Sequence, residues 1–153
     1  GAGDPETRSG DNRKNVRWER KIKICKKYGI KLKYDIFIPK DIHIKNMHIS
    51  IIFNNLIDNA IEACVNLDDN KREKYIHLYC DVIDNKLICV IKNSKNKHPL
   101  ELDKSFKIET LKKDKANHGI GIENLKLTIE KYDGVIDFNI EEYCFTVKFI
   151  IPI

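Results

Sequence analysis

The chain lacks the features by which several classes of protein are recognised from sequence. No apolar run approaches the roughly 18 residues needed to span a bilayer, and no signal-peptide pattern precedes the first periodic segment. The five cysteines have no C-x-x-C spacing, so neither disulfides nor a zinc site is implied. They are Cys25, Cys64, Cys80, Cys89 and Cys144. We therefore expect buried thiols of a reducing compartment in a soluble chain of cytoplasmic character.

Charge is not gathered in one place either. The net charge of +5 comes from lysines spread along the whole chain among many isoleucines and asparagines, whereas nucleic-acid-binding domains cluster positive charge on one face or helix. No nucleophile stands beside a base in the pattern of a covalent hydrolase, and there are no internal repeats. We therefore expect no nucleic-acid partner, and neither zinc chemistry nor covalent catalysis.

The periodicity that is present predicts one α+β domain. A chain of 153 residues is long enough for a single core, and we exclude residues 1–10 as an expression remnant because they are small, polar and aperiodic. Helices and runs of antiparallel strands suggest a two-layer sandwich, with helices covering one face of the sheet. The expected elements are a helix over 13–28 that ends at Gly29, a strand over 30–38, a helix over about 47–67, a hairpin over 75–93 that turns at Asp84-Asn85, a polar loop over about 94–118, a helix from "HGIG" to about residue 131, and a hairpin over 135–151.

The helix over 47–67 carries an unusual polar stripe. Its segment "IFNNLIDNAIEAC" repeats apolar residues at steps of three and four, while Asn55, Asn59 and Glu62 share another face, with Asp58 beside them. Asn and Asp compete with the helix backbone, so a run of them lowers helix stability. Neutral oxygens suit a Mg²⁺ ion that is already shared with phosphates, because Mg²⁺ takes only one or two protein oxygens. The stripe fits either a solvated helix face or a magnesium site.

The segment "HGIGIENL" at residues 118–125 is the second candidate. Its glycines let backbone N–H groups approach an anion, and a helix N-terminus favours phosphate. Two glycines before a helix are also ordinary turn chemistry. The polar loop that precedes them has the length of a lid over a functional site.

Taken in order, these motifs resemble the ATP-binding catalytic domain of the GHKL superfamily, which joins DNA gyrase, heat-shock protein 90, MutL and the histidine kinases. The resemblance covers about residues 30–153 and rests most on "NLIDNAIEA" and "HGIGIENLK", whose wording is most similar to AgrC-type receptors for quorum-sensing peptides. It implies a Bergerat-type sandwich with a mixed, mainly antiparallel sheet. It also implies that residues 11–29 are a linker from a dimerisation hairpin, and that the domain belongs to a membrane-anchored receptor.

The resemblance also implies roles on the polar helix. Asn59 matches the asparagine that coordinates magnesium, and Asn55 lies one turn before it, where a second contact to the metal is possible. In ATP-hydrolysing relatives the position of Asn55 is a glutamate that activates water. An amide cannot take that proton, which favours phosphate transfer over hydrolysis. Glu62 is expected to orient a metal-bound water or to make a structural contact.

Nucleotide contacts follow from the same resemblance. Asn93 matches the Asp of a D-x-G-x-G box that accepts the adenine amino group, but this chain reads "NSKN" and lacks both glycines. A neutral acceptor should bind more weakly than a carboxylate. Gly119 and Gly121 should pass close to the phosphates, with His118 and Asn124 among the nucleotide contacts.

Two lysines of the lid, Lys112 and Lys113, are placed to reach the β- and γ-phosphates, although a solvated lid would also contain them. A histidine kinase further needs a phosphoacceptor histidine, and residues 13–28 contain none. We therefore expect a monomeric catalytic module with ATP and Mg²⁺ as cofactors. Its expected partners are the phosphoacceptor domain of the same receptor and a response regulator. The alternatives are a nucleotide-independent interaction module with a degraded site, and a GHKL-type ATPase or serine kinase.

Overall fold

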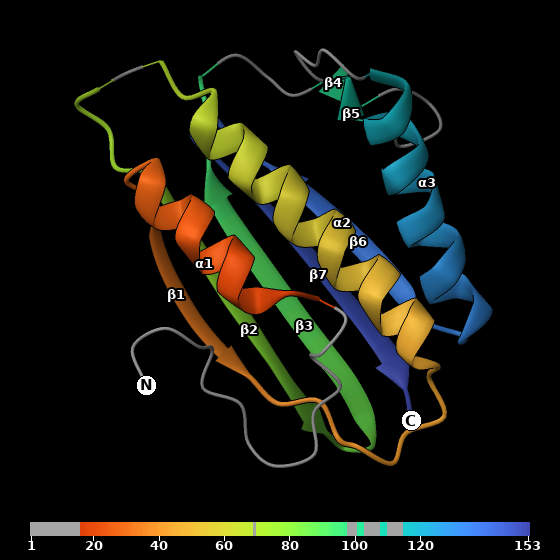
Figure 1. Cartoon of the computed structure of the whole chain (residues 1–153). Helices are drawn as coiled ribbons and strands as arrows, with labels where there is room; N and C mark the ends of the chain where they lie inside the picture. Colours follow the sequence, from red (N-terminus) through yellow and green to blue (C-terminus); the bar gives the residue numbers. More distant parts are fainter. Residues whose placement is uncertain (1–15, 69, 98–100, 103–107, 110–114) are drawn as a thin grey trace.

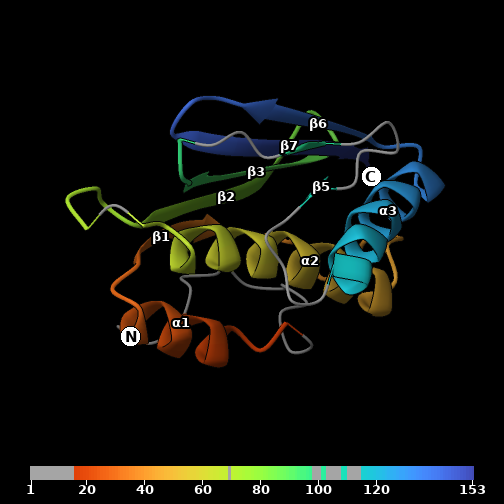
Figure 2. The same cartoon turned by 90° about the horizontal axis from the view of Figure 1, so that it is seen from above.

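The computed structural model describes residues 16–68, 70–97, 101–102, 108–109 and 115–153, and for 101–102, 108–109 and 115–120 it describes the backbone only. The main sheet has five strands in the order β1-β2-β3-β7-β6. Three helices lie on one face of this sheet, with α2 between α1 and α3 (Figures 1 and 2). The elements are α1 (Trp18–Lys27), β1 (Lys31–Ile36), α2 (Asn46–Val65), β2 (Tyr75–Ile83), β3 (Lys86–Ser94), β4 (Glu101–Leu102), β5 (Ile108–Glu109), α3 (Lys115–Lys131), β6 (Val135–Ile140) and β7 (Cys144–Pro152). This architecture confirms the predicted α+β sandwich with helices on one face.

The sheet is mixed, because β1 pairs in parallel with β2 while every other pair in it is antiparallel. A short turn can join only antiparallel strands, and a parallel pair needs a crossover of a dozen or more residues. Here α2 provides that crossover between β1 and β2. The crossover places α2 across the helix-covered face of the sheet, where it packs against α3 (Figure 1).

Two sharp turns follow directly from their residues. Asp84 and Asn85 have φ angles of 51° and 60°, the left-handed pair that a two-residue hairpin turn requires. After α1, Gly29 has φ 68°, the Gly29 N–H donates to Lys26 O at 3.2 Å, and the Ile30 N–H donates to Cys25 O at 2.8 Å. This is a Schellman ending, which explains why the helix stops at a glycine.

The core lies between α2 and the sheet. Ile52, Phe53, Leu56, Ile57, Ala60 and Cys64 make the predicted apolar stripe of α2, and each is at most 3% exposed. The ring of Phe53 packs edge-on against Phe149 of β7, with 6.2 Å between the centroids. Because this stripe is held by the sheet, the polar stripe of the same helix has a fixed direction.

Two predicted boundaries differ from the structure. The first helix begins at Trp18, and residues 13–15 of its predicted range lie outside the described residues. The prediction that the third helix opens only after "HGIG" is wrong, since α3 begins at Lys115 and contains both Gly119 and Gly121. A glycine in a helix interior costs only about 1 kcal/mol relative to alanine, and the surrounding residues are adequate helix formers.

Candidate functional site

The polar stripe of α2 is half-buried. Asn55, Asn59 and Glu62 are each partly covered, and the Oε2 atom of Glu62 is shielded from solvent. Asp58 is different, because its exposed carboxylate accepts a hydrogen bond from Lys21 Nζ of α1 at 2.5 Å. Asp58 therefore ties α1 to α2, and the remaining three side chains form the stripe.

The stripe meets α3 at a glycine. A Cβ atom built on Gly121 would lie 3.0 Å from Asn55 Oδ1 and 3.5 Å from Asn55 Cγ. The absence of a side chain at residue 121 thus lets α3 approach the amide of Asn55. This contact brings a residue of each candidate motif together, although the reason for the glycine differs from the one expected. As an interior helical residue, Gly121 provides room for Asn55 and does not open a helix.

The third predicted residue lies at the end of β3. Asn93 is 3% exposed, and its Nδ2 donates to Ser94 O at 3.0 Å. Ser94 is held near the last turn of α2, because its Oγ lies 3.5 Å from Cys64 Sγ and accepts from Tyr75 N at 3.0 Å. Asn93 is therefore close to the end of α2 that carries Glu62, and it lies on the helix-covered side of the sheet.

Sequence reasoning missed a set of polar contacts around "NSKN", which we call the Lys95 clamp (Arg72, Lys95, Glu142 and Tyr143). Lys95 is 1% exposed, and its ammonium donates to Asn96 O at 3.1 Å and to Glu142 O at 2.8 Å. Burial lowers the pKa of Lys95 below its ordinary value. The segment that replaces the expected glycine box is thus tied firmly to the loop between β6 and β7.

Arg72 supports the same segment from the connection between α2 and β2. Its guanidinium donates to Lys95 O at 3.0 Å and to Tyr143 O at 3.2 Å, and it lies over the Tyr143 ring at 3.7 Å from the centroid. Nothing in the spacing of residues 72, 95 and 143 signals these contacts, because the three come from different loops. One indication of these contacts is present in the sequence, which is that Lys95 stands where a glycine was expected.

Asn96 makes a separate contact with the end of α2. Its Nδ2 donates to Asn66 O at 2.7 Å, and its Oδ1 accepts from Asp68 N at 2.9 Å. Asn66 is the residue that follows the last turn of α2, so Asn96 caps this helix from the start of the predicted lid. The "NSKN" segment therefore joins the end of α2 to the loops on either side of it.

The other predicted site residues are placed as follows. Gly119 lies in α3 within the segment 115–120, of which only the backbone is described, and Asn124 is exposed on the same helix. The side chain of His118 and the whole of Lys112 and Lys113 lie outside the described residues. The short strands β4 and β5 fall within the predicted lid, and β5 lies beside α3 (Figure 1).

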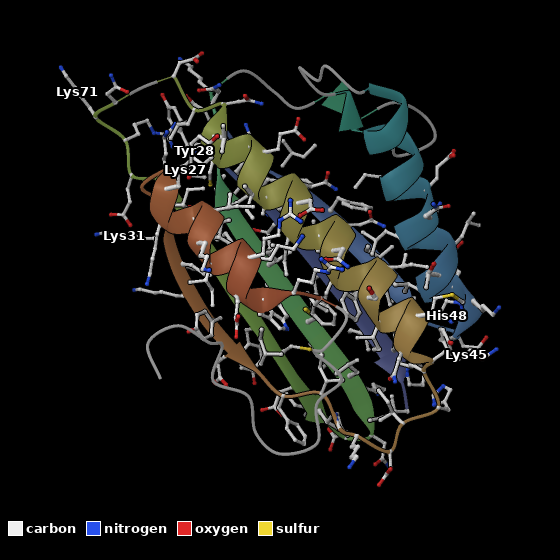
Figure 3. The ribbon with its side chains drawn as sticks, in the orientation of Figure 1. Lys27, Tyr28, Lys31, Lys45, His48 and Lys71 are labelled. Carbon is white, nitrogen blue, oxygen red and sulfur yellow. The ribbon has the colours of Figure 1, made fainter. Side chains whose placement is uncertain are left out.

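A second polar cluster lies at the opposite end of the α2–α3 contact. His48 is 8% exposed, and its Nδ1 is hydrogen-bonded to the hydroxyl of Tyr132. Burial lowers the pKa of His48, and the charges of Lys131 and Lys45 lower it further. Figure 3 shows His48 and Lys45 at the N-terminal end of α2. This cluster joins α2 to α3 and is distant from the end of α2 that carries Glu62.

The donor set fits a magnesium ion that is bound mainly by phosphates. The described residues contain no group of three or more His, Cys, Asp or Glu side chains that could hold a metal alone. The α2 stripe instead offers amide oxygens and one carboxylate, in the small number that Mg²⁺ takes when phosphates and water complete its shell.

Among the described residues, none of the helices has the length and apolar character of a membrane span.

Several solved structures are similar to this chain in fold. The catalytic domain of histidine kinase ThkA aligns with a TM-score of 0.67 at 21% identity, covering 92% of this chain and 89% of that one. A histidine kinase domain from Erythrobacter litoralis EL346 aligns with a TM-score of 0.61 at 11% identity, over 90% of this chain and 60% of that one. Acinetobacter baumannii histidine kinase AdeS aligns with a TM-score of 0.58 at 14% identity, over 88% and 61%.

At these identities the likeness shows the fold, which is that of histidine kinase catalytic domains. No curated protein sequence matches the chain. The sequence itself matches the family model described as the GHKL domain over residues 44–152, which include α2, β3 and α3. The chain therefore belongs to the GHKL domain family.

Proposed function

We propose that this chain is the catalytic domain of a sensor histidine kinase, which binds ATP with Mg²⁺ and transfers the γ-phosphate to a histidine on a separate domain. The observation that carries the proposal is the close approach of Gly121 to Asn55, because it joins the polar stripe of α2 to α3. In this proposal Asn93, which is 3% exposed and close to the C-terminal end of α2, accepts a hydrogen bond from the base. The GHKL family and the histidine kinase fold support the same assignment.

In this proposal the phosphates lie between α2 and the first turn of α3. Asn59 holds the metal through its amide oxygen, with Asn55 one turn away and Glu62 orienting a metal-bound water. When bound, Mg²⁺ neutralises charge on the phosphates during transfer. The first four N–H groups of a helix have no partner within it, so the first turn of α3 can donate to phosphate oxygens. Gly119, His118 and Asn124 of α3 complete the nucleotide contacts.

The residues favour transfer over hydrolysis. A water molecule attacking the γ-phosphate needs a base or an orienting group, and the amide of Asn55 cannot accept a proton. Catalysis would come from positioning, with the terminal phosphate held in line for an incoming histidine and with Lys112 and Lys113 of the lid near the β- and γ-phosphates. The phosphoacceptor domain of the same receptor and a response regulator are the partners that this reaction requires.

The assignment to a quorum-sensing receptor is based on the sequence similarity of two motifs. "NLIDNAIEA" and "HGIGIENLK" resemble AgrC-type receptors, so we place the domain in quorum-sensing signalling, on the cytoplasmic side of a membrane-anchored receptor. We expect this chain on its own to be a monomer, because in this proposal dimerisation belongs to the phosphoacceptor domain.

Calorimetric titration with a non-hydrolysable ATP analogue, with and without Mg²⁺, tests the proposal. We expect Mg²⁺-dependent binding with Kd on the order of 10 µM to 1 mM, equivalent to about 4 to 7 kcal/mol. Asn59→Ala should weaken it by about tenfold, the loss of one metal contact. Asp58→Asn is the matched control, because Asp58 neighbours Asn59 but faces Lys21.

Each alternative has its own result. Absence of heat at millimolar nucleotide would contradict the proposal and favour an interaction module without nucleotide. ATP turnover in the absence of any histidine acceptor would instead favour a GHKL-type ATPase or a serine kinase.

A further inference from the structure

The acceptor at the end of β3 raises a question of base selection. A carboxylate only accepts hydrogen bonds, so it selects the amino group of adenine against the carbonyl group of guanine. An asparagine amide both accepts and donates, and a half-turn of its side chain exchanges the two atoms. A freely turning Asn93 would therefore accommodate either base. The inference that follows rests on the proposed nucleotide site.

Asn93 is not free to turn. Its Nδ2 donates to Ser94 O at 3.0 Å, and the side chain is 3% exposed. A half-turn would break this bond and bring Asn93 Oδ1 against the Ser94 carbonyl oxygen, so two acceptors would face each other in a buried place. The cost of leaving buried polar groups unsatisfied opposes that orientation. With Nδ2 held, Oδ1 is the atom that can be offered to a ligand.

The position of the Ser94 carbonyl depends in turn on the Lys95 clamp. The Ser94 carbonyl shares its peptide unit with the Lys95 N–H, which donates to Tyr143 O at 3.0 Å. The residues that follow are held by the ammonium of Lys95, which donates to Asn96 O and Glu142 O, and by Arg72, which donates to Lys95 O. The Ser94 hydroxyl is held by Tyr75 N on the other side. Arg72 and Lys95 together prevent the chain after β3 from shifting.

We propose that Lys95, supported by Arg72, is a positioning residue that fixes the amide of Asn93 with its oxygen toward the ligand, and so makes the site selective for adenine over guanine nucleotides. When the Lys95 clamp holds it in one orientation, the neutral amide of Asn93 selects adenine as a carboxylate would. Lys95 itself does not touch the base in this arrangement. It acts through the Ser94 carbonyl, which receives the amide of Asn93.

The test is the ratio of affinities for the non-hydrolysable analogues of ATP and GTP, each titrated with Mg²⁺ into the whole chain. We expect the wild-type chain to prefer the adenine analogue by about tenfold or more, since a site built around one hydrogen-bond acceptor rejects a ligand that lacks the donor. Lys95→Met, which keeps the length but removes the ammonium, should reduce the preference to about threefold or less.

Asn93→Asp in the Lys95→Met background separates selectivity from loss of fold. A carboxylate cannot donate in either orientation, so this double variant should recover the preference for adenine. Lys97→Met is the matched control, because Lys97 is exposed and its ammonium pairs with the exposed carboxylate of Glu142 at 3.6 Å. If Lys95→Met does not fold, Arg72→Met tests the same clamp from its more exposed side, with the same loss of selectivity expected.

The outcomes are distinct. Equal affinity of the wild-type chain for the two analogues, or an unchanged ratio in the folded clamp variants, would overturn this inference and leave the nucleotide site standing. Failure of both analogues to bind would overturn the proposed function, and the base selectivity with it.

Discussion

The contact between Gly121 and Asn55 can be tested without any ligand. Alanine is favoured over glycine in a helix interior by about 0.8–1 kcal/mol, so Gly121→Ala would ordinarily stabilise α3. Here the new Cβ would lie 3.0 Å from Asn55 Oδ1, whereas ordinary contact begins at 3.4 Å. The Asn55 amide must therefore shift slightly and strain its side-chain torsions, at a cost of about 0.5–1.5 kcal/mol. The two effects nearly cancel, and the free energy of unfolding should change by less than about 0.5 kcal/mol.

Removing the Asn55 amide should reveal the stability that alanine at residue 121 adds to α3. In an Asn55→Ala background the clash is absent, so Gly121→Ala should raise the free energy of unfolding by about 1 kcal/mol. For a domain of this size that corresponds to a rise in Tm of about 2–4 °C. Urea unfolding of all four proteins, followed by far-ultraviolet circular dichroism, gives the coupling energy. Equal gains in both backgrounds would refute the contact, and with it the meeting of α2 and α3 on which the site depends.

Further expectations concern the packing around the site. Gly134→Ala should destabilise the domain by about 1–3 kcal/mol in urea unfolding, because its Cβ would lie 2.7 Å from the backbone oxygen of Ile150, which cannot move aside; a neutral effect would contradict this packing. Asp58→Asn, which removes the exposed ion pair with Lys21, should cost less than about 1 kcal/mol and leave nucleotide affinity unchanged. Because burial lowers the pKa of His48 below its unfolded value, its contribution to stability is present above about pH 6.5 and is lost as the pH falls through the folded pKa. The Tm of the wild-type chain should thus fall more between pH 7.5 and pH 5 than that of His48→Gln, and parallel curves would contradict this.

The sequence predicted secondary structure best where the hydrophobic periodicity and the turn residues agreed. The apolar stripe of α2, the Asp84-Asn85 turn and the Gly29 helix end are local patterns, and each has the predicted structure. The helix start at Lys115 was missed because glycines were expected to break a helix. Gly121 lies where α3 closely approaches Asn55, and local propensity contains no information on that tertiary contact.

The Lys95 clamp shows a second limit of sequence reasoning. A lysine in a polar loop is ordinarily exposed, and "NSKN" was accordingly interpreted as a degraded glycine box. Burial of Lys95 depends on Glu142, 47 residues away, and on Arg72 in a third loop. Such a junction becomes visible only once the fold has brought the three loops together.

The central claim is that a metal–nucleotide site lies between α2 and α3. Replacing Mg²⁺ with paramagnetic Mn²⁺ in the presence of the ATP analogue, and mapping line broadening of backbone amides by nuclear magnetic resonance, tests this claim most directly. The account predicts the strongest broadening at Asn55, Asn59 and Gly121, and a decrease along α2 toward His48. Broadening that requires no nucleotide, or that is centred on the open face of the sheet, would contradict it.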